Sequence, residues 1–227
     1  MPQVAAKRLR QDEPGSSRSR ILDAAEALFA QRGYYGVSVR EITREAGVQL
    51  ALASYYFASK EELFRQVVAR RADEHCADLA AALDGALAAA EPALPAVEAV
   101  IRAFLEPVLI RSLTGGGGWK NYIQVLAWAM NMRANEDFLR PLVEIWTPLN
   151  KRFVGVLWSL YPHRPVEDIH WAFYFLEASL IHILVEAGVV DRQSAGTCRS
   201  SDLEAILRHM VPYYAAAFAR FGDGTGR

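Results

Sequence analysis

The sequence predicts an all-α protein, on three observations. Apolar residues recur at helical spacing in one segment after another, and Ser-x-x-Glu capping signals precede two of these segments. No stretch alternates apolar and polar residues for long enough to form a useful strand. With 227 residues, 52% of them apolar, the chain is long enough for a small domain and a larger one.

A first helix is expected over residues 18–32. Its apolar side chains fall on one face at helical spacing: Ile21, Leu22, Ala25, Leu28 and Phe29. Gly33 ends this helix. The preceding residues, 1–17, are polar and basic and contain Pro14-Gly15-Ser16-Ser17, so they are expected to form a disordered arm.

Two short helices joined by a tight turn are expected next. Ser38 and Glu41 form a capping box, in which each side chain accepts a hydrogen bond from the other residue's backbone N–H, so a helix begins there. Gly47 adopts positive φ at low cost and turns the chain into a second helix, from about Gln49 to Tyr56. This is the pattern of a helix-turn-helix, whose second helix places its N-terminal residues against base edges in the DNA major groove.

The charge distribution agrees with that interpretation. The net charge is −1, yet residues 1–71 carry a net +4 and residues 72–227 a net −5. Five basic residues come at or before the start of the first helix, Lys7, Arg8, Arg10, Arg18 and Arg20, and three lie in or beside the two short helices, Arg40, Arg44 and Lys60. Attraction to phosphates supplies most non-specific DNA affinity, so a basic N-terminal part favours DNA binding. The alternative for the arm is a solvated tail with ordinary surface charge.

A long Ala-rich helix is expected over residues 60–90. A second capping box, Ser59 with Glu62, begins it, and Pro92 and Pro95 end it. Further helices are expected over 95–112, interrupted at Pro107, and over 119–133, 136–160, 165–188 and 202–221. Four consecutive glycines, 115–118, and a polar stretch, 191–201, are expected to be loops.

The N-terminal residues resemble a known family, the TetR-type transcriptional regulators. The resemblance rests on the first helix and on the aromatic run that follows the second short helix, Tyr55-Tyr56-Phe57-Ala58-Ser59-Lys60-Glu61-Glu62-Leu63. It covers roughly residues 18–65. It implies a three-helix DNA-binding domain (18–64), a larger helical ligand-binding and dimerisation domain (65–221), and a flexible tail (222–227).

A set of residues in and around the second short helix is expected to contact double-stranded DNA. The set is Ser38, Arg40, Gln49, Leu50, Ala51, Ser54, Tyr55, Tyr56 and Lys60. Gln49 can form two hydrogen bonds with adenine, whereas Leu50 and Ala51 can contact only thymine methyl groups or sugar. Few direct base contacts are therefore expected from this helix, and recognition of DNA shape is expected to contribute to specificity. Ser54 and Tyr56 stand where many family members have an aromatic residue and a histidine.

The last two helices present more apolar surface than one core requires. Residues 171–185 are apolar nearly all round, and the terminal helix carries an apolar stripe that includes Phe218. Either other helices of the same chain cover these faces or a second copy does. TetR-type proteins dimerise through their final two helices, so the resemblance implies a homodimer with Phe218 in the interface, bound to a palindromic operator.

All five tryptophans and many other aromatics follow residue 100, which suits a pocket for a small, largely apolar effector with one polar end. The candidate ligand-binding residues are Phe104, Trp119, Tyr122, Trp128, Met132, Trp146, Phe153, Trp171 and Phe175. The alternative for each is ordinary core packing. A diffuse similarity of this part to fatty-acid- and acyl-CoA-responsive TetR-type regulators favours an effector of that kind.

Other classes of protein lack support in the sequence. Cys76 and Cys198 are the only cysteines, no signal peptide or long apolar run is visible, and a cytoplasmic protein that does not enter the membrane is expected. No catalytic or metal-binding constellation is complete, so neither an enzyme nor a bound cofactor is expected. The alternative function is a helical small-ligand carrier or adaptor without DNA binding.

Overall fold

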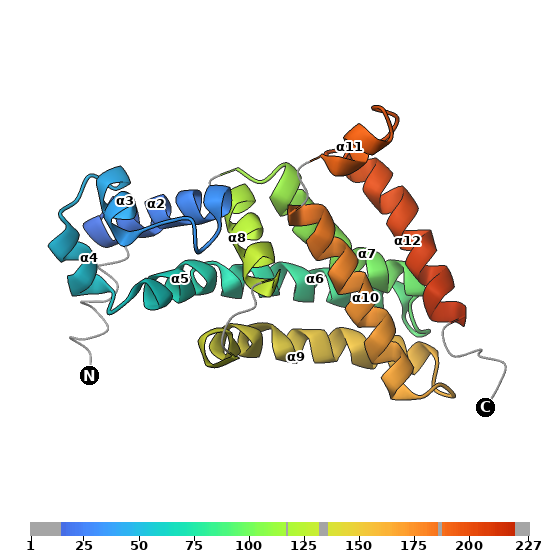
Figure 1. Cartoon of the computed structure of the whole chain (residues 1–227). Coiled ribbons are helices and arrows are strands. Elements are labelled where there is room, and N and C mark those ends of the chain that lie inside the picture. The colour runs from blue at the N-terminus through green and yellow to red at the C-terminus, as the bar shows by residue number, and fades with distance from the viewer. Residues whose placement is uncertain (1–14, 117, 132–135, 186–187, 221–227) are drawn as a thin grey trace, which may run out of the picture. The chain divides into compact units, whose positions relative to one another are not determined.

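The computed structural model describes residues 15–116, 118–131, 136–185 and 188–220, with the backbone alone for 136–139 and 142. All regular structure in these ranges is helical, which confirms the predicted all-α fold (Figure 1). The helices are α2 (Ser17–Arg32), α3 (Val39–Glu45), α4 (Leu50–Tyr56), α5 (Lys60–Ala69), α6 (Ala72–Ala90), α7 (Val97–Leu113), α8 (Trp119–Asn131), α9 (Glu136–Leu160), α10 (Val166–Val185), α11 (Val189–Gln193) and α12 (Leu203–Arg220). The expected arm before residue 15, the tail after residue 220 and Met132 lie outside the described residues.

The chain forms two compact units, and it enters the first of them twice. Unit 1 contains the residues up to Ala72 together with 116–142, and unit 2 contains 73–115 and everything from Val143 onward. Helix α8 therefore belongs to the N-terminal unit although it follows α7 in sequence. The domain boundary expected after residue 64 did not anticipate that return.

The core of unit 1 is built where α2 meets α5. Phe29 and Phe64 are fully buried and meet edge to face at 5.2 Å, and Tyr34 packs on Phe64 in the same way. The apolar face of α2 expected from the sequence is buried as a whole: Ile21, Leu22, Ala25, Leu28 and Phe29. These contacts hold the helix-turn-helix on a rigid support.

The capping and turn signals produce the expected local geometry. Both halves of the Ser38–Glu41 capping box are present at the start of α3. Gly33 and Gly47 have positive φ, 67° and 63°, where a side chain is disfavoured. At α5 the Ser59 hydroxyl accepts from the backbone N–H of Glu62, 3.2 Å away. Local sequence therefore determines where these helices begin and end.

Three expectations about helices are wrong in detail. The long helix over 60–90 is divided at Arg70 and Arg71, and both guanidinium groups turn back to carboxylates of α2. Pro107 does not interrupt α7, because buried neighbours such as Phe104 and Val108 hold the turns on either side of it. The short helix α11 lies partly in the stretch expected to be a loop.

Unit 2 is organised around α7, against which α12 packs. Phe104, Phe153 and Phe173, from three helices, form an aromatic cluster with ring centroids 4.8–6.3 Å apart. Phe218 is fully buried, so its expected place in an interface is wrong: it is core packing within one chain. Two ionisable side chains of this unit, the buried His75 and the half-buried Glu177, have shifted pKa values. Burial lowers the pKa of His75 to about 4 and raises the pKa of Glu177, which accepts a hydrogen bond from Asn150.

Helix α8 is fixed in unit 1 by a polar contact as well as by apolar packing. It packs against α2 and α5 and buries Trp119 and Tyr122. The guanidinium of Arg71 lies 5.3 Å from the Trp119 ring centroid and forms an ion pair with Glu26, which is 3% exposed. Burial raises the pKa of Glu26 and the Arg71 charge opposes that shift. We call these three residues, Glu26, Arg71 and Trp119, the α8 anchor.

A substitution at Gly118 tests how closely the residues of the α8 anchor pack around it. Its φ is +87°, and a Cβ there lies 2.7 Å from Glu26 Oε1 and 2.9 Å from Arg71 Nη2. We expect Gly118→Ala to lower the free energy of unfolding by about 1–3 kcal/mol through backbone strain and displacement of the ion pair. Thermal and urea unfolding measure it. Gly116→Ala is the control, because nothing lies within 4 Å of a Cβ there; equal effects of the two variants contradict a tight anchor.

Candidate DNA-binding surface and effector-binding residues

One side of α4 has no partner in the described structure. Ala53, 1% exposed, fixes α4 to the rest of unit 1. The rest of the helix surface exposes Leu50, Ala51, Ser54 and Tyr55, with Leu50 48% and Tyr55 67% exposed, and Gln49 is exposed at the N-cap. The side chain of Gln49 makes no capping hydrogen bond. The residues expected to read bases thus share one accessible surface.

Two cations on α3 border that face. Arg40 and Arg44 are exposed one helical turn apart, and their guanidinium groups form no ion pair with the described residues. They help to line a hollow of about 500 Å³ between α3 and α4, which also includes Val48 and Leu50. Arg44 was not among the candidate site residues. Its spacing of four from Arg40 is the sequence signal that identifies it.

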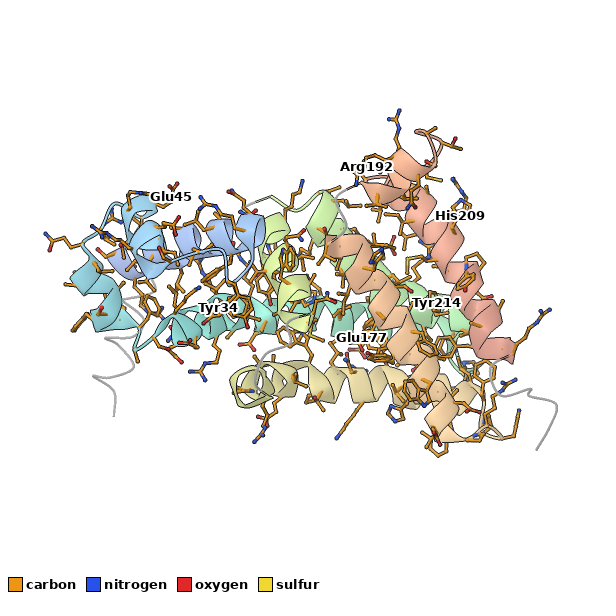
Figure 2. All side chains as sticks on the ribbon, viewed as in Figure 1. Tyr34, Glu45, Glu177, Arg192, His209 and Tyr214 are labelled. Atoms are coloured by element: carbon orange, nitrogen blue, oxygen red, sulfur yellow. The ribbon has the colours of Figure 1, made fainter. Side chains whose placement is uncertain are left out.

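The remaining DNA-contact candidates are partly engaged inside unit 1. The Ser38 hydroxyl is held by Glu41 in the capping box, and that bond lowers the pKa of Glu41. The Lys60 ammonium lies 4.2 Å from the centroid of the Tyr34 ring, and partial burial lowers the pKa of Lys60. Tyr56 is half-buried between its neighbouring rings. Figure 2 shows Tyr34 in this unit.

The candidate effector-binding residues do not come together at one site in the described structure. Trp119 and Tyr122 are buried in unit 1, and Trp128 on the same helix is 38% exposed. Phe104 and Phe153 belong to the aromatic cluster of unit 2. Sequence spacing does not distinguish these environments, because each residue suits any apolar surface.

Trp146 differs from the other candidates. It is 9% exposed in unit 2, and its indole Nε1–H has no hydrogen-bond partner in the described structure. A buried donor without a partner costs free energy, so it is a candidate polar contact for a ligand. Trp146 does not line either of two hollows of unit 2 that lie between α10 and α12.

Helix α10 carries an exposed aromatic face. Trp171, Tyr174 and Phe175 contact one another and are 45–57% exposed, while Ile169 and Phe173 on the other side are buried. By length and composition alone α10 is apolar enough to cross a membrane, with 28% of its most apolar window buried. The buried stripe instead fits it into the core of unit 2, and the exposed aromatics mark an interaction surface.

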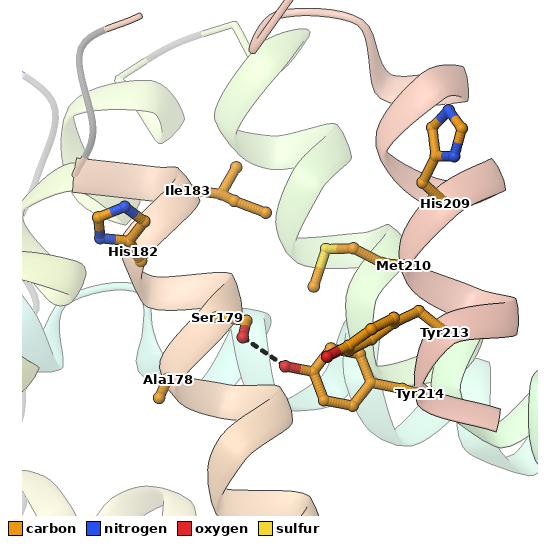
Figure 3. A pocket seen from close by; sticks show the side chains of 8 residues that line it. All are labelled: Ala178, Ser179, His182, Ile183, His209, Met210, Tyr213 and Tyr214. Atoms are coloured by element: carbon orange, nitrogen blue, oxygen red, sulfur yellow. Dashed lines mark hydrogen bonds between the residues drawn. The ribbon is translucent and has the colours of Figure 1, made fainter. Parts of the chain in front are cut away.

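Two adjoining hollows lie between α10 and α12. The first, about 630 Å³, is open and runs past Ser179, His182, Met210 and Tyr213 (Figure 3). At its floor the hydroxyls of Ser179 and Tyr214 are hydrogen-bonded, and Tyr214 donates to the backbone carbonyl of Phe175. The second, about 600 Å³, lies at α11 and shares His182, Ile183, His209 and Met210 with the first.

Curated relatives match stretches of between 53 and 83 residues of the chain. The probable helix-turn-helix transcriptional regulator YttP of Bacillus subtilis is 43% identical over 53 residues, which are 23% of this chain and 26% of that protein. The chain thus spans about a quarter of the length of this relative.

Solved structures match nearly the whole chain. A regulator from Pseudomonas aeruginosa PAO1 is 21% identical, covers 90% of this chain and 93% of its own, and has a TM-score of 0.59. FadR from Bacillus subtilis, solved in complex with stearoyl-CoA, is 17% identical, covers 87% of this chain and 97% of its own, and has a TM-score of 0.60. At these identities the likeness shows the fold alone.

Two family models account for most of the sequence. The model described as bacterial regulatory proteins, tetR family, matches residues 21–67, which contain α2 through most of α5. The model described as tetracyclin repressor-like, C-terminal domain, matches residues 102–217, half of the chain. With both models in the expected order, the chain belongs to the TetR family of bacterial regulatory proteins.

Proposed function

We propose that this chain is a ligand-responsive transcriptional regulator that binds an operator in double-stranded DNA as a homodimer. The observation that carries the proposal is the exposed surface of α4, bordered by Arg40 and Arg44, which form no ion pair with any residue that the structure describes. A helix that buries only one residue fully and presents its N-terminal side chains outward has the geometry of a recognition helix. We place the protein in the cytoplasm and assign it no catalytic role or cofactor.

Base readout in this proposal is mostly apolar. Gln49, at the N-cap of α4, is suited to a bidentate contact with adenine, and Leu50 and Tyr55 offer apolar surface to thymine methyls. Arg40, Arg44 and Lys60 contact phosphates and set the register of the helix on the duplex. With few base-specific hydrogen bonds, sequence-dependent DNA shape contributes to specificity.

The exposed aromatics of α10 support the homodimer. Trp171, Tyr174 and Phe175 form a contiguous patch, and Tyr213 on α12 is 70% exposed. A second copy that covers this patch removes aromatic surface from water at both subunits, since a two-fold interface uses the same patch twice. Two recognition helices related by that axis predict a palindromic operator.

Helix α8 supports a route from effector to DNA. It packs in unit 1, but its sequence neighbours α7 and α9 belong wholly or mainly to unit 2. A ligand that displaces α7 or α9 therefore pulls on the α8 anchor, and through Glu26 and Arg71 on α2 and the end of α5. A ligand acts in this way only to the extent that it binds more tightly to the protein with α7 or α9 displaced than to the protein without that displacement.

The effector class follows from the composition of unit 2. Its aromatic cluster and the apolar hollows between α10 and α12 suit a small, largely apolar molecule with one polar end. The stearoyl-CoA in the FadR structure likewise joins a long apolar chain to a polar head, although its head is large. Repression released by the effector is the mode we propose, in keeping with the family model of a tetracyclin repressor-like domain.

Paired substitutions test the DNA-binding face. Lys60→Ala removes a cation, so it should weaken binding to operator and random duplex alike and reduce the slope of log affinity against log salt by about one. Gln49→Ala should instead lower the preference for operator over random duplex. Fluorescence anisotropy with labelled duplexes at several salt concentrations measures both.

Lys120→Ala is the matched control, because it removes an exposed cation from α8, outside the helix-turn-helix. We expect operator binding close to that of the unmodified protein. If Lys60→Ala and Lys120→Ala behave alike and Gln49→Ala leaves specificity unchanged, this face of the helix-turn-helix does not bind DNA. A carrier or adaptor without DNA binding is then the better assignment.

A negative charge introduced among the exposed aromatic residues of α10 tests the proposed homodimer. Tyr174→Glu places a carboxylate in the proposed interface, where desolvation of an unpaired charge should split the dimer and abolish operator binding. Light scattering gives the mass. Leu94→Glu, at a residue 55% exposed outside α10 and α12, should remain dimeric. A Tyr174→Glu protein that stays dimeric removes this face from the interface.

A further inference from the structure

We propose that unit 2 carries a binding site for an amphipathic anion where α10, α11 and α12 meet. The cavity there has a volume of about 600 Å³, which lies in the range of small-molecule sites. Ile183, Val189, Ile206 and Met210 supply an apolar lining. We call this cavity the α11 pocket.

The Arg and Asp side chains that line the α11 pocket carry a net positive charge. Arg199 and Arg208 both line it, and their guanidinium groups form no ion pair with the described residues. Asp202 also lines it, but its carboxylate accepts the backbone N–H of Ala205 at 2.9 Å and so caps α12. Two unpaired guanidinium groups beside an apolar lining select a carboxylate or phosphate attached to an apolar body.

The segment that carries Arg199 is structured. The Asp191 carboxylate accepts the backbone N–H of Ser200 at 2.9 and 3.0 Å, which lowers the pKa of Asp191. The backbone N–H of Cys198 donates to the Ser194 hydroxyl at 2.8 Å. These bonds hold the backbone on both sides of Arg199 before a ligand arrives, so little backbone ordering entropy opposes binding.

The open hollow in Figure 3 extends the α11 pocket. The two share Ile183 and Met210, and the hollow continues along α10 and α12 to Tyr213. An anionic head at Arg199 and Arg208 therefore leaves room for an aliphatic tail beside Met210 and towards Tyr213. The ligand chemistry is that of an alkyl carboxylate or alkyl phosphate of medium chain length.

The regulatory meaning of this site rests on the proposed function. Helices α10 and α12 are those to which we assign the dimer interface, so a tail between them changes the surface that each subunit offers its partner. The polar end of the effector is then an anion, and it is bound outside the aromatic cluster of Phe104, Phe153 and Phe173.

Titration calorimetry of the full-length protein with dodecanoate and with dodecyl phosphate, each below its micelle concentration, tests the site. Dodecanol is the uncharged comparison. We expect Arg199→Gln and Arg208→Gln each to weaken binding of the anions about tenfold, because each removes a charge-assisted contact. The anion that binds more tightly identifies the head group. Arg220→Gln, at the exposed far end of α12, should change nothing.

The alkylation rate of Cys198, which lines the pocket, is an independent readout. Bound dodecanoate should slow modification of Cys198 by iodoacetamide, as measured by peptide mass spectrometry. The site is refuted if neither anion binds, if dodecanol binds equally well, if the two arginine variants bind as Arg220→Gln does, or if Cys198 is not protected.

Operator affinity separates this proposal from the proposed function. If dodecanoate releases operator from the unmodified protein and not from the Arg199→Gln/Arg208→Gln double variant, the α11 pocket is the effector site. If it releases both equally, the protein is still a ligand-responsive regulator, and its effector acts elsewhere.

Discussion

The ion pair between Arg71 and Glu26, covered by the Trp119 ring, is the contact on which the arrangement of unit 1 depends. It joins three segments that are distant in sequence: α2, the break after α5, and the start of α8. A carboxylate that is 3% exposed is tolerated only because a cation is paired with it, so the loss of any member leaves an uncompensated buried charge or an uncovered pair. Gly118 fits beside this pair because it has no side chain.

The recognition face is a consequence of the same packing. Because α2 and α5 supply the core of unit 1, α4 needs to contribute only Ala53 to it, and the rest of that short helix is free to face outward. The exposed Leu50 and Tyr55 are unfavourable in water, which is consistent with surface retained for a partner. The partner that we assign to this surface is DNA.

Local signals predict much of this fold. Capping residues and glycines predict the end of α2, the start and end of α3 and the start of α5, because these depend on hydrogen bonds between residues three or four apart. The return of α8 to unit 1 was not predictable, since it depends on packing between residues about 90 positions apart. Phe218 and Tyr174 show the same limit: both lie on apolar helices, and only the tertiary structure buries the first and exposes the second.

The DNA-contact candidates divide in a similar way. Leu50, Ala51, Ser54 and Tyr55 are exposed because helical spacing keeps them off the side of α4 that buries Ala53, and Gln49 is exposed at the N-cap. The candidate effector-binding aromatics are spread over both units. They were selected by residue type alone, and the sequence does not show which other side chains each of them contacts. The cations at the α11 pocket left no signal in the sequence, because Arg199 and Arg208 come together only through the loop after α11.

Helix α8 is, in our interpretation, an integral part of the DNA-binding unit. Amide hydrogen exchange on the full-length protein, with and without operator duplex, tests this most directly. We predict that operator binding slows exchange in α8 together with α2 and α4, although α8 is not among the helices assigned to contact DNA. Slower exchange confined to the helices of residues 15–72, with α8 exchanging as in the free protein, would contradict this interpretation.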